Sequence, residues 1–247
     1  MSDRALPIDP ETRRAIDEVY RVFSRYPLPT AWDAAPGENC EHRLAVLSSA
    51  PLKKLTGDQL GPYADGALLT IGGVDDYRHF LPRIIELAAL GCGNWMGLDV
   101  PIVTCRLEYG HWRNWPKDEQ AALIEVFLAA FESALHQRPH VGLDAEPWLC
   151  GLAVLGEDIS PLLARWASST DPNAALQAAS FLCYEPSRLL GSSDNAAYWS
   201  YAEARAWSAL GAWAFSEDVA SLLRSALSVS TLDDRGEIER ALVALCA

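Results

Sequence analysis

The residues with the clearest potential for chemistry are crowded into the segment at residues 70–90, TIGGVDDYRHFLPRIIELAAL. Four titratable side chains lie within five positions there: Asp75, Asp76, Arg78 and His79. In a helix, a carboxylate three or four positions before a histidine can orient its imidazole, and such a pair can act as a general base. Polar groups forced into a core must also be paired, so the same cluster can be structural. The two interpretations are an enzyme or metal site and a polar brace.

Pro82 interrupts the helical pattern of this segment. Proline has no N–H to donate, and its ring clashes with the carbonyl group of the residue four positions earlier in a continuous helix. The segment is therefore either a turn at 74–80 followed by a new helix, or one helix from 74 to 90. In both cases we expect an apolar face that points inward: Tyr77, Phe80, Leu81, Ile84, Ile85 and Ala88.

A second cluster, HWRNW, combines large aromatic rings with a cation: Trp112, Arg113 and Trp115. Tryptophan and arginine are the residue types that dominate binding hot spots. Large aromatic side chains are also mostly buried, so the cluster can equally cover the edge of a core. Both alternatives remain, and we include the three residues among the candidate binding residues.

The 70–90 segment resembles a bacterial protein family of unknown function that shares a TxGxxxDYRHFLPR-type block. The matching positions are Thr70, Gly72, Asp76, Tyr77, Arg78, His79, Phe80, Leu81, Pro82 and Arg83. The resemblance extends over residues 10–135 and includes Trp112, Trp115, Pro116 and Gln120. It implies no activity, and the closely spaced cysteines of many relatives are reduced here to Cys40.

Motifs for cofactor chemistry are missing from the sequence. The six cysteines are spaced singly, and Cys40 with His42 gives only half of a zinc ligand set, which Cys92, Cys105 or His111 would have to complete. There is no GxSxG, no phosphate-binding loop and no dinucleotide fingerprint. We therefore predict no catalytic residue, no metal ligand and no cofactor.

The charge of the chain is −13, from 20 basic and 33 acidic residues. Residues 138–247 carry 7 basic and 14 acidic side chains. This field repels phosphate backbones, which argues against nucleic acid, and attracts a basic protein. The acidic candidates for the contact are Glu217, Asp218, Asp233 and Asp234.

Helical periodicity and caps predict an all-α fold of helical hairpins packed side by side, with an irregular HEAT-like solenoid as one form of it. In the first helix, Asp9 is expected to cap and Pro10 to occupy the first position. Residues 98–110 are ambiguous between strand and helix. The helix after Pro116 is expected to bury a stripe: Ala121, Ile124, Phe127, Leu128, Phe131 and Leu135. We divide the chain into 1–140 and 141–247, packed as one compact unit.

These features favour a non-catalytic protein that binds another protein. Its most concrete form is an immunity or antitoxin-type protein of a bacterium, which neutralises a basic toxin or effector domain through an acidic surface. The charged N-terminal segment lacks the apolar stretch of a secretory signal, and apolar runs are too short to span a bilayer, so we expect a cytoplasmic protein. The alternative is an enzyme or metal-binding protein that uses Asp75, Asp76 and His79. The oligomeric state does not follow from the sequence.

Overall fold

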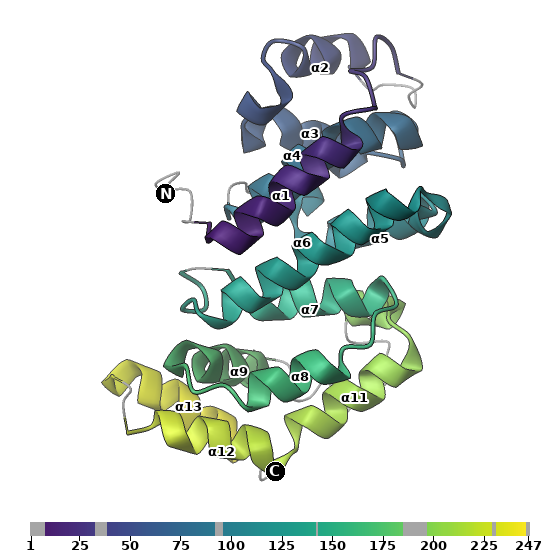
Figure 1. Cartoon of the computed structure of the whole chain (residues 1–247). Helices are drawn as coiled ribbons and strands as arrows, with labels where there is room; N and C mark the ends of the chain where they lie inside the picture. Colours follow the sequence, from purple (N-terminus) through teal and green to yellow (C-terminus); the bar gives the residue numbers. More distant parts are fainter. Residues whose placement is uncertain are drawn as a thin grey trace. The chain divides into compact units, whose positions relative to one another are not determined.

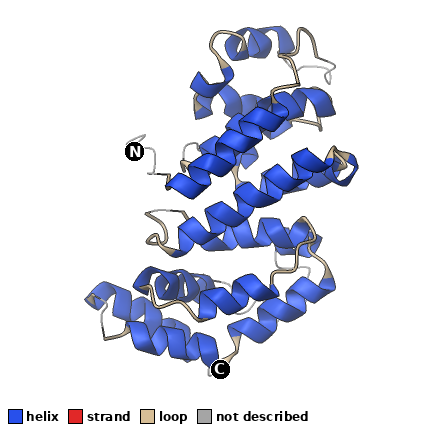
Figure 2. Cartoon of the chain, viewed as in Figure 1, coloured by secondary structure: helices blue, strands red, loops and turns tan. Residues whose placement is uncertain are grey.

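The computed structural model describes residues 8–32, 39–91, 96–141, 143–184, 197–228 and 231–245. Within these ranges the regular structure is helical, and the one bridge pairs Ala67 with Ile71 (Figure 1, Figure 2). The all-α class predicted from the sequence is confirmed. The HEAT-like arrangement stays a prediction. No helix in the described ranges combines the length and apolar character that crossing a membrane requires.

Two compact units make up the chain, Met1–Ala129 and Ala130–Ala247. The division predicted from composition lies near residue 140, after the longest helix. In the structure the boundary falls inside that helix, α6 (Lys117–Leu135). One continuous helix therefore supplies residues to the cores of both units.

In the described part of the first unit, five α-helices precede α6, together with three short 3-10 helices. Their bounds are α1 Pro10–Phe23, α2 Cys40–Leu47, η1 Leu52–Lys54, α3 Gly57–Gly66, α4 Val74–Ala89, η2 Met96–Leu98, α5 Val100–Tyr109 and η3 Trp112–Asn114. Helix α4 packs against α1, α3 and α5, so the segment singled out in the sequence occupies the centre of this unit.

Local sequence explains where these helices begin. Asp9 accepts hydrogen bonds from the backbone N–H groups of Glu11 and Thr12, and Pro10 is the first residue of α1, as predicted. Helix α3 begins with a capping box in which Thr56 and Gln59 bond each other's backbone N–H groups. Such reciprocal bonds satisfy donors that a helix start leaves without partners.

Helix α4 resolves the alternatives around Pro82, because the helix is continuous from Val74 to Ala89 with the proline inside. The expected inward face is buried except for Ala88, which is partly exposed. The ambiguous segment that follows is helical, as α5. In α5 the Thr104 hydroxyl donates to the carbonyl oxygen of Val100 at 2.8 Å, so a buried polar group is satisfied within the helix.

The buried stripe of α6 is rotated from the expected one. Ala121 is exposed, and the buried positions are Ala122, Leu123, Val126, Phe127, Ala130, Phe131, Ala134 and Leu135. Apolar residues occur nearly all round this helix, so periodicity alone did not fix which of them faces a neighbour.

The second unit begins with the end of α6, and its described residues continue with six α-helices and one 3-10 helix. Their bounds are α7 Ala145–Val154, α8 Ser160–Ala167, α9 Pro172–Tyr184, η5 Ala197–Tyr201, α11 Ala204–Ala214, α12 Glu217–Ala226 and α13 Leu232–Ala244. Helix α9 packs against α7, α12 and α13, and α8 packs against α11 and α12. Aromatic rings pack together in the core. The ring centroid of Trp166 lies 4.7 Å from that of Trp213, in a tilted arrangement, and 5.8 Å from that of Phe131, edge to face.

Candidate functional site

The two carboxylates of the 70–90 segment have different roles from those of a catalytic dyad. Asp76 accepts a hydrogen bond from the backbone N–H of Gly73 at 2.7 Å, which satisfies a donor at the start of α4. Asp75 is 75% exposed and pairs with Arg78 at 3.0 Å. Its position in the first turn of α4 aims the Asp76 carboxylate back at the helix start.

His79 makes its hydrogen bond outside helix α4. Its Nδ1 lies 2.9 Å from the carbonyl oxygen of Tyr26, and a carbonyl oxygen can only accept, so Nδ1 carries the proton. The imidazole thus holds the chain after α1 against α4. The hydrogen-bond partner of His79 therefore comes from a segment outside the one that Pro82 interrupts.

Arg78 joins the two clusters that the sequence presented separately. Its guanidinium lies 4.2 Å from the ring centroid of Trp115 and 5.1 Å from that of Tyr26, which is cation–π geometry. Its Nε is 3.6 Å from Glu119, a carboxylate with no exposed surface. The Tyr26 hydroxyl donates to Glu119 at 2.6 Å, and burial with this bond raises the pKa of Tyr26 to about 12.

The HWRNW cluster is the edge of a core. Trp115 and Trp112 are each 4% exposed, and the Trp115 indole N–H donates to the carbonyl oxygen of Gly110 at 2.9 Å. Glu108 accepts from the Trp112 indole N–H at 2.6 Å and from the exposed Arg113 at 2.6 Å. The tryptophans therefore pack inward, and the exposed members of the cluster are His111, Arg113 and Asn114.

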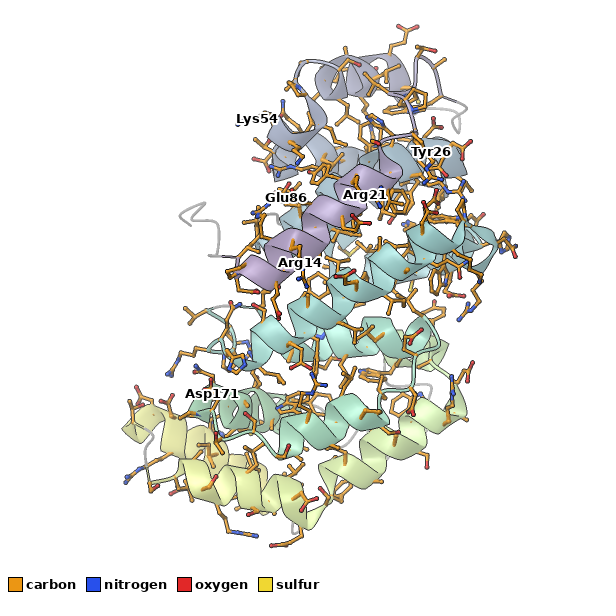
Figure 3. The ribbon with its side chains drawn as sticks, viewed as in Figure 1. Arg14, Arg21, Tyr26, Lys54, Glu86 and Asp171 are labelled. Carbon is orange, nitrogen blue, oxygen red and sulfur yellow. The ribbon has the colours of Figure 1, made fainter. Side chains whose placement is uncertain are left out.

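A second buried carboxylate, Glu86, lies near the other end of α4, beside α1 (Figure 3). It accepts hydrogen bonds from Arg13 at 2.5 Å, Tyr20 at 2.7 Å and Arg83 at 2.6 Å. Burial by itself raises the pKa of Glu86, but the three donors outweigh burial and hold the pKa below its ordinary value. Arg83 also donates to the carbonyl oxygen of Leu55, the residue after η1, at 2.7 Å. Through its donors on α1 and through Arg83, Glu86 therefore connects α1, α4 and the end of η1.

These contacts make the 70–90 segment the polar brace of the first unit. Asp75, Asp76 and His79 are each engaged by a partner other than one another, so the general-base pair that an enzyme would need is not formed in this described part of the chain. Among the described residues no group of three or more His, Cys, Asp or Glu side chains could hold a metal ion. Cys92, one of the ligands considered for Cys40 and His42, lies outside the described residues.

The acidic candidates in the second unit differ in burial and in ion pairing. Asp234 is 5% exposed and bonds Arg138 and the Thr231 hydroxyl, and these bonds lower its pKa. Exposed Glu217 pairs with Arg224. Asp218 and Asp233 are exposed in the first turns of α12 and α13. Asp234 is therefore a structural group, and the surface candidates are the other three.

Asp218 lies in a groove between α8 and α12. The groove has a volume of about 360 Å³ and is lined by small, polar and acidic side chains together with one leucine: Ala164, Ala167, Ser168, Ser169, Asp218, Ser221, Leu222 and Ser225. On α12 these residues follow helical spacing and form one face. Small side chains allow another backbone to approach closely, and the carboxylate favours a cation.

Comparisons with protein-family models, with curated proteins and with solved structures gave no match for this chain. The resemblance through the DYRHFLPR block therefore stays a prediction. The fold and the site define an all-α protein with a polar brace in its first unit and an acidic groove in its second.

Sequence reasoning missed both buried carboxylates of the brace. Glu119 and Glu86 lie in helices rich in charged residues, and nothing in their spacing separates them from exposed neighbours. The one available signal was Glu86 itself, a lone acid in the apolar run IIELAAL. A charged side chain within an apolar run is either buried and paired with oppositely charged groups, or it turns that part of the helix toward solvent.

Proposed function

We propose that this protein works as a binding module, an immunity or antitoxin-type inhibitor that neutralises a basic toxin or effector domain in the cytoplasm. The observation that carries the proposal is the groove between α8 and α12, where the exposed carboxylate of Asp218 lies among serine and alanine side chains. A groove of this kind accepts a helix or strand that carries an arginine or lysine.

The charge of the surrounding chain supports the same proposal. Residues 138–247 carry 14 acidic against 7 basic side chains. A field of one sign raises the rate of encounter with an oppositely charged protein and disfavours partners of like charge. Nucleic acid is therefore not part of the proposal.

Co-expression with the product of the adjacent gene tests this function. We expect the two proteins to co-purify, and we expect the chain to restore the growth of cells that the neighbour inhibits. Asp218→Arg should weaken binding at least tenfold, because it places a positive charge in the groove. Ser221→Trp should weaken binding through volume alone.

Glu41→Arg is the matched control for Asp218→Arg. Glu41 is exposed and is the second residue of α2, as Asp218 is of α12, so both substitutions make the same unfavourable change at a helix start. Binding unaffected by Asp218→Arg, or reduced equally by Glu41→Arg, would contradict the assignment of the groove. A neighbour that neither binds nor harms cells would contradict the function.

A further inference from the structure

Ser180, on helix α9, faces a histidine and a carboxylate from the loop between α6 and α7. The Ser180 Oγ lies 2.9 Å from Nε2 of His140. On the other side of the ring, Nδ1 of His140 lies 4.0 Å from Oδ2 of Asp144. The order of groups is that of a serine–histidine–carboxylate triad, with the carboxylate at ion-pair distance from Nδ1 and outside hydrogen-bond distance.

The loop that carries the histidine is held in place by several bonds. His140 adopts a left-handed backbone conformation with φ of 62°, and its backbone N–H donates to Oδ1 of Asp144 at 3.0 Å. The side-chain amide of Gln177, one turn before Ser180 on α9, donates to the backbone carbonyl oxygens of Gln137 and Leu143 in the same loop. A left-handed conformation in a residue other than glycine costs about 1–3 kcal/mol, and such strain gathers at functional sites.

The two ring nitrogens of His140 have different neighbours, a carboxylate beside Nδ1 and a neutral hydroxyl beside Nε2. The carboxylate of Asp144 faces Nδ1 and favours N–H there, which leaves the lone pair of Nε2 for the Ser180 hydroxyl. The His140 side chain is 56% exposed, whereas Ser180 is 7% exposed. The hydroxyl is thus sheltered beside a base that solvent can reach.

We propose that Ser180, His140 and Asp144 form a nucleophilic site that takes an acyl group from a carboxylic ester. The Ser180 proton passes to Nε2 of His140 as Oγ bonds to the acyl carbon, the carbon–oxygen bond to the alcohol breaks, and the alcohol takes that proton. Water then gives a proton to Nε2 and bonds to the acyl carbon, which releases Ser180 Oγ to take the proton back. Asp144 stabilises the imidazolium that exists between these transfers.

These three residues supply a nucleophile, a base and an orienting charge, but no donor for the oxyanion on the acyl carbon. Such donors contribute a large part of the rate in serine hydrolases. We therefore expect covalent modification of Ser180 with slow turnover. This activity is independent of the groove between α8 and α12, and either proposal can fail without the other.

A fluorophosphonate tests the proposal on the full-length chain, because it reacts with activated serines and releases fluoride. We expect stoichiometric labelling, located at Ser180 by peptide mass spectrometry and lost in Ser180→Ala. His140→Asn should slow labelling at least a hundredfold while keeping a side chain that tolerates the left-handed conformation. Asp144→Asn should slow it by a smaller factor.

His136→Asn and Ser208→Ala are the controls. His136 lies 2.7 Å from a carboxylate oxygen of Asp171, so the first removes a histidine–aspartate pair outside the triad, and the second removes an exposed helical serine. Both should label like the wild type. No label on the wild type, or label that persists in Ser180→Ala, would overturn the proposal.

A second variant keeps the test informative if Ser180→Ala does not fold. In Ser180→Cys the introduced thiol should be alkylated by iodoacetamide at pH 7 at least tenfold faster than in the double variant with His140→Asn, because the imidazole removes its proton. Equal rates would show that His140 only satisfies the hydroxyl of Ser180, and would overturn the proposal.

Discussion

At the scale of single residues, the first unit depends on two buried carboxylates that are paired in different ways. Glu86 has three donors at hydrogen-bond distance. Glu119 has one, the Tyr26 hydroxyl, and two arginines that stay 3.6–3.7 Å away. Arginine and carboxylate groups this close are strongly coupled when water is excluded. The brace is therefore best tested at Glu86, where a single substitution removes a charge that two arginines share.

Glu86→Gln keeps the shape of the side chain and removes its charge. We expect it to lower the free energy of unfolding by about 2–4 kcal/mol at pH 7, because Arg83 is left buried without its counter-ion. Urea denaturation measures the change. The control is Glu125→Gln, since Glu125 is 52% exposed and 3.8 Å from Arg14, and its removal should cost less than about 0.5 kcal/mol.

The same carboxylate predicts how stability changes with pH. The pKa of Glu86 in the folded protein lies below its ordinary value of 4.5, so its contribution is fully present above that pH and is lost as pH falls through the lowered pKa. The difference between wild type and Glu86→Gln in urea should shrink steadily below about pH 4.5. A difference that grows toward acid pH would contradict the assignment.

Substitutions of Asp75 and Asp76 test whether the 70–90 segment is a structural brace or a binding surface. Asp76→Ala should lower the free energy of unfolding by about 1 kcal/mol, because the Gly73 N–H loses its acceptor. Asp75→Ala should change it by less than about 0.5 kcal/mol, since its ion pair is exposed. Thermal or urea unfolding of both variants measures these changes. An equal loss of unfolding free energy in the two variants would show that the Asp75–Arg78 pair stabilises the fold more than its exposure indicates.

At the scale of elements, two glycines with opposite surroundings report on helix packing. A Cβ on Gly97, in η2, would lie 2.2 Å from the backbone carbonyl carbon of Ala64, in α3, which no side chain can tolerate. A Cβ on Gly211, inside α11, would meet nothing within 4 Å. Only glycine fits at position 97, because the backbones of η2 and α3 are in contact there. At position 211 no neighbour requires a glycine, which only weakens helix α11.

Alanine at these two positions should therefore act in opposite directions. We expect Gly97→Ala to lower the free energy of unfolding by about 3 kcal/mol through overpacking. Gly211→Ala should raise it by about 0.5–1 kcal/mol through helix propensity. Circular dichroism during urea unfolding measures both. A tolerated Gly97→Ala would show that η2 does not pack on α3 as described.

At the scale of the whole molecule, the net charge of −13 governs encounter more than stability. If the proposed basic partner is recruited by this field, its association rate constant should fall at least tenfold between 0.01 M and 1 M salt. The screening length shortens over that range from about 30 Å to about 3 Å. Stopped-flow mixing at several salt concentrations measures the rate, and a rate independent of salt would contradict electrostatic recruitment.

The elements of this fold were largely predictable, because helix starts and stops are local. Asp9 with Pro10 set the start of α1, and in the same way Ser216 caps α12. Residues 98–110 were not predictable, since a short apolar run has no distinguishing period. The burial face of α6 also depended on neighbours distant in the sequence.

What the sequence by itself determined is the all-α class, the start of α1 and a net charge of −13 to which both halves of the chain contribute. What only the tertiary structure decided is which polar groups meet. Arg78 reaches Trp115, Glu86 joins Arg13, and His140 finds Ser180 across long stretches of chain. The reason is physical: helix formation and capping act over a few neighbouring residues, whereas pairing of buried polar groups depends on how helices far apart in the sequence pack.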